Sequence, residues 1–351
     1  MKTHDIHVQA LGVHLPPDRV TLEEAIEQGL CTRDEFFESD LVGVPVAGRS
    51  STVDMAVDAG RQALQRANLD PAALDLLVHA PMAREVPEAW APSGYILREL
   101  KCGPTAAHTV SQGCNATLAG LELAAGWLSL AAARSTALVT SALKAEPPYY
   151  ERWRSAGFGM ALGDGASAVL VGRAPGIARI DAINSVTHPD LEGLHRGSLD
   201  LSDQAALAHQ KVDVPARARE YAMEPGFDSF DLHRMFSTMY ADVARLSLDE
   251  HGIGPEDLKR VLFTNAGAAL IEADVMQPLG LPMELSTWDY GRTIGHIGAS
   301  DQILSLDHLF HTGELAVGDR VLLVGGTQGY NVSSVLLTVT APVAPDATVS
   351  R

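Results

Sequence analysis

Three residues in this sequence have the types and settings needed for nucleophilic catalysis: Cys114, His296 and Asp301. Cys114 lies in the segment Ala106–Thr117, and apolar residues at helical spacing follow it. This pattern predicts a sharp turn from a strand into a helix at Cys114. A thiol at such a turn meets the positive end of the helix dipole and unpaired backbone N–H groups, which favour the thiolate and can hold an oxyanion. We therefore predict that Cys114 is a nucleophile.

His296 and Asp301 lie in a second turn of the same kind, Thr293–Asp301, which an apolar helix pattern also follows. This turn belongs to the second half of the chain, whereas Cys114 belongs to the first. If two similar lobes face each other, the two turns meet, and a Cys and a His in contact can exchange a proton. Asp301 would then orient the imidazole and stabilise its charged form. The alternatives are a capped loop histidine and a carboxylate that the helix dipole alone favours.

Two glycine-rich segments accompany these turns. Leu162–Val169 predicts a tight Asp-Gly hairpin that leads into a central strand, which is a structural role. In Val324–Gly329, glycines at a strand end allow close approach of the backbone to a ligand. The N–H groups of Gly326 and Cys114 are the predicted oxyanion donors. Neither segment predicts a phosphate loop, because no Lys-Ser or Lys-Thr follows.

The remaining cysteines and histidines predict no metal site and no disulfide. Cys31 and Cys102 are interpreted as small space-filling residues, and the three cysteines are widely spaced without a CxxC pair. His308 and His311 are close together on one helix pattern, but without further ligands nearby they predict a solvated helix face. A chain that needs no metal and forms no disulfide fits a reducing cytoplasm.

The composition describes an ordinary globular chain and excludes some partners. The chain has 351 residues, of which 46% are apolar and 20% charged, and its formal net charge is −18. A surface this negative repels nucleic acid and anionic lipid. The first residues lack the apolar core of a signal peptide, and no apolar run is long enough to span a membrane. We therefore expect a cytoplasmic protein that binds neither nucleic acid nor membrane.

Alternating helix and strand patterns predict an α/β fold with an internal repeat. The phrase Pro71–Val78 recurs as Pro255–Phe263, and the strand Ala137–Thr140 recurs as Val321–Val324, with the same offset in both cases. We predict an N-terminal lobe, 1–172, that carries the Cys and a C-terminal lobe, 173–351, that carries the His and Asp. Chance similarity of short strands is the alternative. The stretch 185–240 breaks the pattern and is expected to pass over a pocket, although its aromatic and Met residues could simply be core.

Over nearly its whole length the sequence resembles the thiolase-fold ketoacyl synthase III family. The resemblance rests on Leu11–Pro16, the helix Asp54–Asn68 with Asp70–Pro81, the Cys114 turn, the Gly-Asp-Gly-Ala segment and the Gly325-Gly326 turn. It implies an α/β thiolase fold with two duplicated lobes in a five-layer αβαβα arrangement, and a homodimer. It also implies that an acyl group passes to the Cys from coenzyme A or an acyl carrier protein, with no separate cofactor.

One departure from the family pattern implies a particular activity. Condensing members have a His in a Pro-His-Gln-Ala phrase where this chain has Phe263–Gly267, and an Asn where it has His296. The pair used for decarboxylation is therefore replaced. His296 with Asp301 resembles the Cys-His-Asp triad of ketoacyl-synthase-like acyltransferases of natural-product pathways, such as the malonyl-transferring enzyme of cervimycin biosynthesis. Asn265 would then line the substrate pocket without acting as acid or base.

The resemblance implies transfer of an acyl group, without decarboxylation, to a small-molecule acceptor or to another carrier protein. The acceptor would present a hydroxyl or amine, as in a polyketide glycoside of an antibiotic pathway. Two alternatives stay open at this point. One is a starter condensing enzyme of the synthase III type, which would use His296 in an altered geometry. The other is a non-catalytic subunit like a chain-length factor, against which the retained Cys114 argues.

Overall fold

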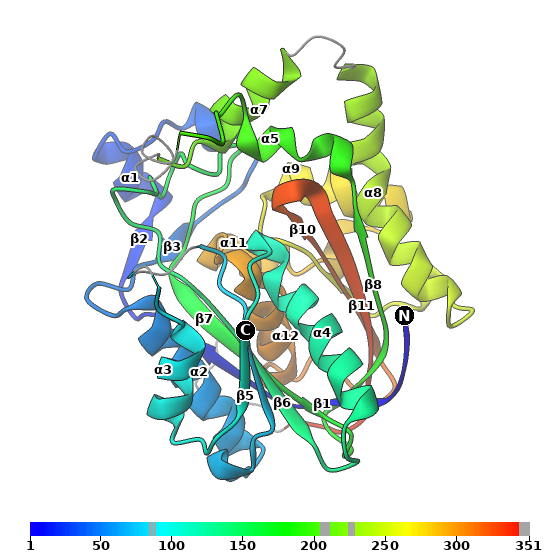
Figure 1. Ribbon diagram of the computed structural model, residues 1–351. Coiled ribbons are helices and arrows are strands. Elements are labelled where there is room, and N and C mark those ends of the chain that lie inside the picture. Colours follow the sequence, from blue (N-terminus) through cyan, green and yellow to red (C-terminus); the bar gives the residue numbers. More distant parts are fainter. Residues whose placement is uncertain (84–86, 88, 204–210, 224–228, 344–351) are drawn as a thin grey trace.

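The computed structural model describes residues 1–83, 87, 89–203, 211–223 and 229–343 (Figure 1). The strands are β1 Lys2–His14, β2 Arg19–Thr21, β3 Gly43–Pro45, β4 Leu76–His79, β5 Ala106–Thr109, β6 Thr136–Leu143, β7 Gly165–Gly172, β8 Ala178–Thr187, β9 Arg260–Leu262, β10 Arg320–Thr327 and β11 Asn331–Val339. The helices are α1 Leu22–Glu27, α2 Thr52–Arg66, α3 Pro92–Leu100, α4 Ala116–Leu130, α5 Gly193–Arg196, α7 Val214–Ala222, α8 Ser229–Asp249, α9 Ala268–Ile271, α10 Gln277–Leu279, α11 Trp288–Ile294 and α12 Asp301–His311.

One long mixed sheet links the two halves of the chain. Within the described residues its order is β5-β4-β6-β7-β1-β8-β11-β10-β9, and β2 pairs separately with β3. The first strand, β1, pairs antiparallel with β7 on one side and with β8 on the other. It therefore joins the N-terminal strands to the C-terminal strands. Figure 1 shows the two groups of strands on either side of α4 and α12.

Alternation along the strands explains how five layers form. Val139 of β6 and Val321 of β10 belong to the same central core, which they share with α4 and α12. Their neighbours point the other way, because successive side chains of a strand face opposite sides. Leu138 packs with α2, and Leu322 packs with α8. The layers are helix, strands, helices, strands and helix, so the predicted αβαβα arrangement is confirmed.

The internal repeat is visible in the positions of the strands. The starts of β4 and β9 are separated along the chain by the same offset as the starts of β6 and β10. The helical turns Gly113–Asn115 and Gly298–Ser300, which precede α4 and α12, begin with left-handed glycines of φ 50° and 59°. In this match Cys114 corresponds to Ala299, three residues after His296, so the two turns are equivalent as predicted. The division into lobes at residue 172 stays a prediction.

The Gly-Asp-Gly segment is structural, but the predicted tight hairpin is wrong. Residues 144–164 form a long connection between the antiparallel strands β6 and β7. Asp164 is fully buried at its end, where it accepts hydrogen bonds from the backbone N–H groups of Ala47 and Ala145, both at 2.8 Å. Arg152 donates to both carboxylate oxygens at 2.9 Å. The Asp is therefore needed for long-range contacts and not for a local turn.

The stretch 185–240 contains the end of β8, α5, α7 and the beginning of α8, while its residues 204–210 and 224–228 lie outside the described part. In Figure 1, α5 and α7 lie at the end of the molecule toward which the N-terminus of α4 points. The ring of His195 in α5 contacts the ring of Tyr330, just after β10, at a centroid distance of 5.0 Å. The excursion thus packs beside the glycine-rich end of β10. In the described ranges, no helix combines the length and apolar character needed to cross a bilayer.

Candidate active site

Cys114 lies at the predicted turn from strand to helix. Strand β5 ends at Thr109, and the helical turn Gly113–Asn115 leads into α4 at Ala116. Asn115 and Ala116 are fully buried, whereas the side chain of Cys114 is partly exposed. The fold therefore buries the start of α4 while it leaves the thiol within reach of a substrate.

His296 and Asp301 meet Cys114 across the two halves of the chain. The Nε2 of His296 lies 3.0 Å from the Sγ of Cys114. Its Nδ1 lies 2.6 Å from the Oδ2 of Asp301. The imidazole is almost completely buried, and the carboxylate is completely buried. The structure thus brings together the three residues that the sequence selects, in the order nucleophile, imidazole and carboxylate.

The Asp301 carboxylate is held by more than the imidazole. It is the first residue of α12, and its Oδ1 accepts a hydrogen bond of 2.7 Å from the N–H of Ile297. Its Oδ2 also accepts one of 2.8 Å from the N–H of Asn265. The side-chain nitrogen of Asn265 donates to the carbonyl of Gly295 at 2.8 Å. Asn265 therefore braces the loop before His296 from a buried position, and its predicted contact with substrate stays a prediction.

The segment Ala161–Gly163 fixes the backbone of His296. The N–H of His296 donates to the carbonyl of Ala161 at 2.9 Å, and its carbonyl accepts from the N–H of Gly163 at 2.8 Å. A Cβ on Gly163 would lie 2.5 Å from the carbonyl oxygen of Ile294, so only glycine fits this approach. The Gly-Asp-Gly segment of the first half therefore positions the imidazole that the second half supplies.

The electrostatics of the site favour a charged imidazole. Burial alone lowers the pKa of His296, but the negative charges of the Cys114 sulfur and the Asp301 carboxylate, together with their hydrogen bonds, raise it well above the usual value. A charged imidazole 3.0 Å from the Cys114 sulfur stabilises negative charge on that sulfur, and the thiolate is the nucleophilic form of a cysteine.

The predicted oxyanion donors are arranged differently from the expectation. The N–H of Cys114 already donates to the hydroxyl oxygen of Thr327, at 2.8 Å. Gly326 lies against Tyr240, since a Cβ at Gly326 would lie 2.5 Å from the Tyr240 ring. Among the described residues, β9 pairs with β10 over Val321–Leu323 alone, so the last residues of β10 pair only with β11. Donation by the Gly326 N–H to an oxyanion stays a prediction.

Three residues near Cys114 escaped the sequence analysis: Thr327, Tyr150 and Tyr240. Tyr150 and Cys114 pack against the same apolar cluster. Burial, with a smaller effect of the nearby Cys114, raises the pKa of Tyr150 to about 12, and burial also raises the pKa of Tyr240. Both phenols are therefore neutral hydrogen-bond donors at physiological pH. The sequence signals were indirect: Tyr240 ends the predicted excursion over a pocket, and Thr327 lies in the glycine-rich segment Val324–Gly329.

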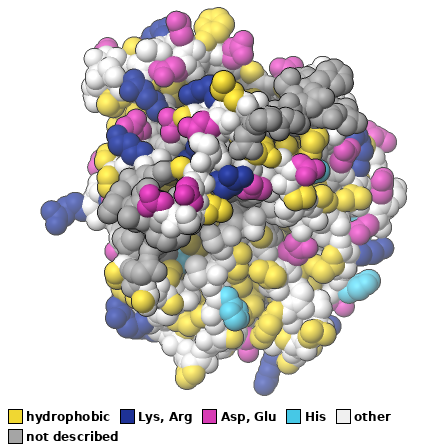
Figure 2. Space-filling model, turned by 45° about the horizontal axis from the view of Figure 1, so that its top comes forward, with side chains coloured by type: hydrophobic (Ala, Val, Ile, Leu, Met, Phe, Trp, Pro, Cys, Tyr) yellow, Lys and Arg dark blue, Asp and Glu magenta, His cyan; other side chains and the backbone are white. Residues whose placement is uncertain are grey.

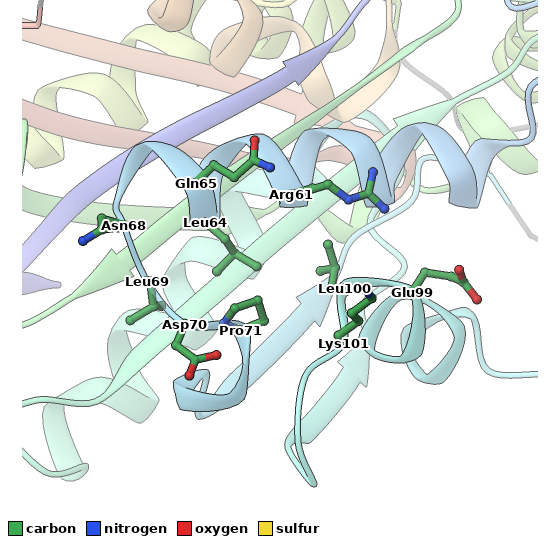
Figure 3. Close-up of a pocket in the computed structure, with 10 residues that line it drawn as sticks. All are labelled: Arg61, Leu64, Gln65, Asn68, Leu69, Asp70, Pro71, Glu99, Leu100 and Lys101. Atoms are coloured by element: carbon green, nitrogen blue, oxygen red, sulfur yellow. The ribbon is translucent and has the colours of Figure 1, made fainter.

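A separate groove lies away from this site. It has a volume of about 800 Å³ and is bounded by the C-terminal ends of α2 and α3 (Figure 3). Its lining residues are Arg61, Leu64, Gln65, Asn68, Leu69, Asp70, Pro71, Glu99, Leu100 and Lys101. None of the three catalytic candidates lines it, so the groove plays no part in the chemistry described here.

The chemistry that the arrangement allows is transfer through a covalent intermediate. A thiolate attacks a carbonyl, a buried imidazole moves protons, and a carboxylate stabilises the charged imidazole. The Asn265 amide does not titrate, and its N–H₂ group is engaged with Gly295. Proton transfer in this site therefore falls to His296.

Comparisons with known proteins find relatives that match nearly the whole chain. The family described as 3-oxoacyl-[acyl-carrier-protein (ACP)] synthase III C terminal matches residues 248–339. The beta-ketoacyl-[acyl-carrier-protein] synthase III of Oleidesulfovibrio alaskensis is 26% identical over 344 residues, which cover 94% of this chain and 98% of that protein.

Two solved structures are informative. ChlB3, described as an acyltransferase, has a TM-score of 0.90 and 35% identity, and the match covers 97% of this chain and 99% of that chain. The priming beta-ketosynthase of the R1128 polyketide biosynthetic pathway has a TM-score of 0.76 and 22% identity over 97% and 98% of the two chains. The second likeness concerns the fold alone.

The Asp301→Asn variant should show whether the Asp301 carboxylate supports the charge on His296. Because the carboxylate raises the pKa of His296, its loss should lower that pKa and shift the pair toward neutral thiol and imidazole. Alkylation of Cys114 by iodoacetamide, followed by peptide mass spectrometry, should slow roughly tenfold near pH 6. The difference should shrink above about pH 9, where a free thiol ionises without help.

Asp289→Asn is the matched control, because Asp289 is an exposed carboxylate in the same half of the chain. It should follow the wild-type profile. An Asp301→Asn profile that superimposes on the wild type would show that Asp301 does not support the charged pair.

Proposed function

We propose that this chain, which belongs to the 3-oxoacyl-[acyl-carrier-protein] synthase III family, is an acyltransferase that works through a Cys114 acyl-enzyme and does not decarboxylate its donor. The donor is an acyl thioester of coenzyme A or of an acyl carrier protein. The acceptor is a hydroxyl or amine of a specialised metabolite, such as a polyketide glycoside of an antibiotic pathway, or another carrier protein. The observation that carries the proposal is the buried His296–Asp301 pair 3.0 Å from the Cys114 sulfur.

In the first half-reaction Cys114 becomes acylated. His296 Nε2 takes the thiol proton, and the thiolate attacks the thioester carbonyl to form a new carbon–sulfur bond. Collapse of the tetrahedral intermediate breaks the bond to the pantetheine sulfur. That sulfur takes the proton from His296 and leaves as a free thiol. The carbon–sulfur bond gained on Cys114 equals the one lost from the donor.

In the second half-reaction the acceptor replaces Cys114. His296 takes the proton of the acceptor hydroxyl or amine as the oxygen or nitrogen attacks the acyl-enzyme carbonyl. The Cys114 thiolate leaves, and the site returns to the thiolate–imidazolium pair. Asp301 supports the imidazolium in both half-reactions, because its two oxygens are fixed by the N–H groups of Ile297 and Asn265.

Retention of the donor's carboxyl group follows from the same residues. Decarboxylation of a malonyl thioester needs hydrogen-bond donors that hold the developing enolate oxygen. The Asn265 side-chain nitrogen donates to Gly295 instead, and the Asp301 carboxylate next to His296 would oppose a second anion. These contacts favour transfer of the intact acyl group.

A starter condensing synthase is the second candidate. It is favoured by the sequence relatives, which are named as beta-ketoacyl-[acyl-carrier-protein] synthases III. Such an enzyme would form a carbon–carbon bond and release carbon dioxide. A non-catalytic partner subunit, the third possibility, would bind a synthase without gaining acyl mass, and the contact between Cys114 and His296 argues against it.

The charge distribution does not favour coenzyme A over an acyl carrier protein as the acyl donor. In the excursion Lys211 pairs with Glu151 at 2.8 Å and Arg196 pairs with Glu192 at 2.6 Å, whereas Arg217 donates to backbone carbonyls. Figure 2 shows basic and acidic side chains interspersed on this face. A phosphate of coenzyme A and an acidic carrier protein would each have to compete with these carboxylates.

Cys114→Ala should abolish acyl-enzyme formation, whereas Cys31→Ala and Cys102→Ala should not. Cys114 contacts the imidazole of His296, while burial raises the pKa of Cys102 to about 11 and also raises the pKa of Cys31. Intact-mass measurement after exposure to a panel of acyl thioesters, followed by peptide mapping, tests this. An adduct mapped to Cys31 or Cys102 would refute the assignment of the nucleophile.

With a malonyl thioester labelled at its free carboxyl, wild-type protein should release pantetheine thiol without releasing labelled carbon dioxide. The reason is that the enolate donors of a condensing site are replaced by Asn265 and by His296 paired with Asp301. Thiol release and trapped carbon dioxide are measured together, with Cys114→Ala as the control. Carbon dioxide released in step with thiol, and absent in the control, would favour the condensing synthase.

We also propose that the chain acts as a homodimer, as the family resemblance implies. Strand β5 is an edge strand with mostly exposed side chains. Leu123, Trp127 and Leu130 on one face of the neighbouring α4 are exposed by 56%, 36% and 93%. Light scattering should give the mass of two 37.3 kDa chains, and Leu123→Asp should weaken the dimer while Val317→Asp should not. A wild-type mass of one chain would contradict the proposal.

A further inference from the structure

The last residues of β10 face alternate sides of their strand, and Thr327 faces Cys114. A Cβ on Gly325 would approach Asn115 and Gln302 in the central layer. One on Gly326 would meet Tyr240 on the outer side. Thr327, one residue further, points inward again, and its hydroxyl oxygen accepts the hydrogen bond from the N–H of Cys114 at 2.8 Å. Strand alternation therefore brings this hydroxyl to the nucleophile.

The hydrogen bond changes which group can stabilise an oxyanion. The N–H of Cys114 is the donor that a turn at a helix N-terminus would offer to a tetrahedral intermediate, but here it is spent on Thr327. A hydroxyl that accepts one hydrogen bond still has its own proton to donate. Donation from the backbone N–H polarises the hydroxyl and makes it a better donor. The Thr327 hydroxyl can thus donate to an oxyanion in place of the Cys114 N–H that it binds.

We propose that the Thr327 hydroxyl is a catalytic oxyanion donor: it accepts from the Cys114 N–H and donates to the carbonyl oxygen of the thioester. The inference rests on the proposed acyl transfer and adds a residue to it. Both tetrahedral intermediates would receive this hydrogen bond, since both develop on the carbonyl attached to Cys114. Thr327 is buried, so the hydroxyl acts where water competes little.

The surroundings hold Thr327 in place for this role. Its backbone is extended, and it pairs with Asn331 at the start of β11. The Tyr240 ring packs against the preceding Gly326 so closely that no side chain fits there. A β-branched side chain on an anchored strand has few rotamers, which keeps the hydroxyl directed at the Cys114 N–H.

A series of substitutions at Thr327 tests the proposal through the rate of Cys114 acylation in a single turnover. Thr327→Val keeps the shape but removes the hydroxyl, and acylation should slow about 100-fold or more, the effect of losing one oxyanion donor. Thr327→Ser should restore most of the rate. Thr327→Ala should also be slow, because the Cys114 N–H is left one hydrogen bond away from the carbonyl. Thr340→Val, which loses a hydroxyl hydrogen bond to Gly176, is the control and should react like wild type.

Alkylation of Cys114 by iodoacetamide separates catalysis from structure, because this reaction forms no oxyanion. The Thr327→Val variant should keep its alkylation rate while its acylation rate falls. The proposal would be overturned if Thr327→Val were acylated at the wild-type rate, or if Thr327→Ala were acylated at the wild-type rate or faster. It would also be overturned if Thr327→Val lost its alkylation rate in parallel with its acylation rate. None of these results would contradict the proposed acyltransferase function. Absence of acylation in the wild type, with every thioester, would refute the proposed function and this inference with it.

Discussion

The completely buried carboxylate of Asp301 holds the candidate active site together. Asp301 accepts hydrogen bonds from the His296 ring and from the N–H groups of Ile297 and Asn265, so it joins α12, the loop before α12 and the segment after β9. A charge in this position is tolerable only because every contact is made, and loss of one partner of a buried pair costs about 3–5 kcal/mol. The same contacts that satisfy the carboxylate also orient the imidazole toward Cys114. Stability and reactivity of the site therefore depend on one residue.

The fold supplies this site by bringing two helix N-termini together in its central layer. Strand β1 joins the two halves of the sheet, and the start of α4 then meets the start of α12 between them. Each half contributes what the other lacks: the first half supplies the thiol and the glycine that fixes the His296 backbone, and the second half supplies the imidazole and the carboxylate. The internal repeat is not symmetric in its chemistry, because the counterpart of Cys114 is Ala299. The duplicated framework has been used for two different tasks.

Much of this arrangement was predictable from local patterns, and the rest depended on contacts distant in sequence. The strand and helix periods and the constant offset predicted a duplicated α/β fold, and the resemblance to a known family implied the five layers. The two turns predicted which residues would meet. The Asp-Gly hairpin was wrong because the partners of the Asp164 carboxylate, such as Arg152, lie in a connection whose path no local pattern reveals. Thr327 was missed because its role follows from the inward or outward direction of single residues at the end of β10. The hydrogen bonds of Asn265 to Gly295 and Asp301 were likewise not predicted, because they depend on the loop geometry and not on the residue type alone.

The central claim is that the acyl group on Cys114 is transferred intact to an oxygen, nitrogen or sulfur nucleophile, and the discharge of isolated acyl-enzyme tests it most directly. Acyl-enzyme freed from donor is mixed with acceptors that carry hydroxyl groups, amines or a carrier-protein thiol, and both the adduct and the products are followed by mass. The account predicts that one of these classes empties Cys114 and that an equal amount of ester, amide or thioester appears with the whole acyl group. Discharge only by a malonyl thioester, with carbon dioxide and a new carbon–carbon bond as products, would contradict it.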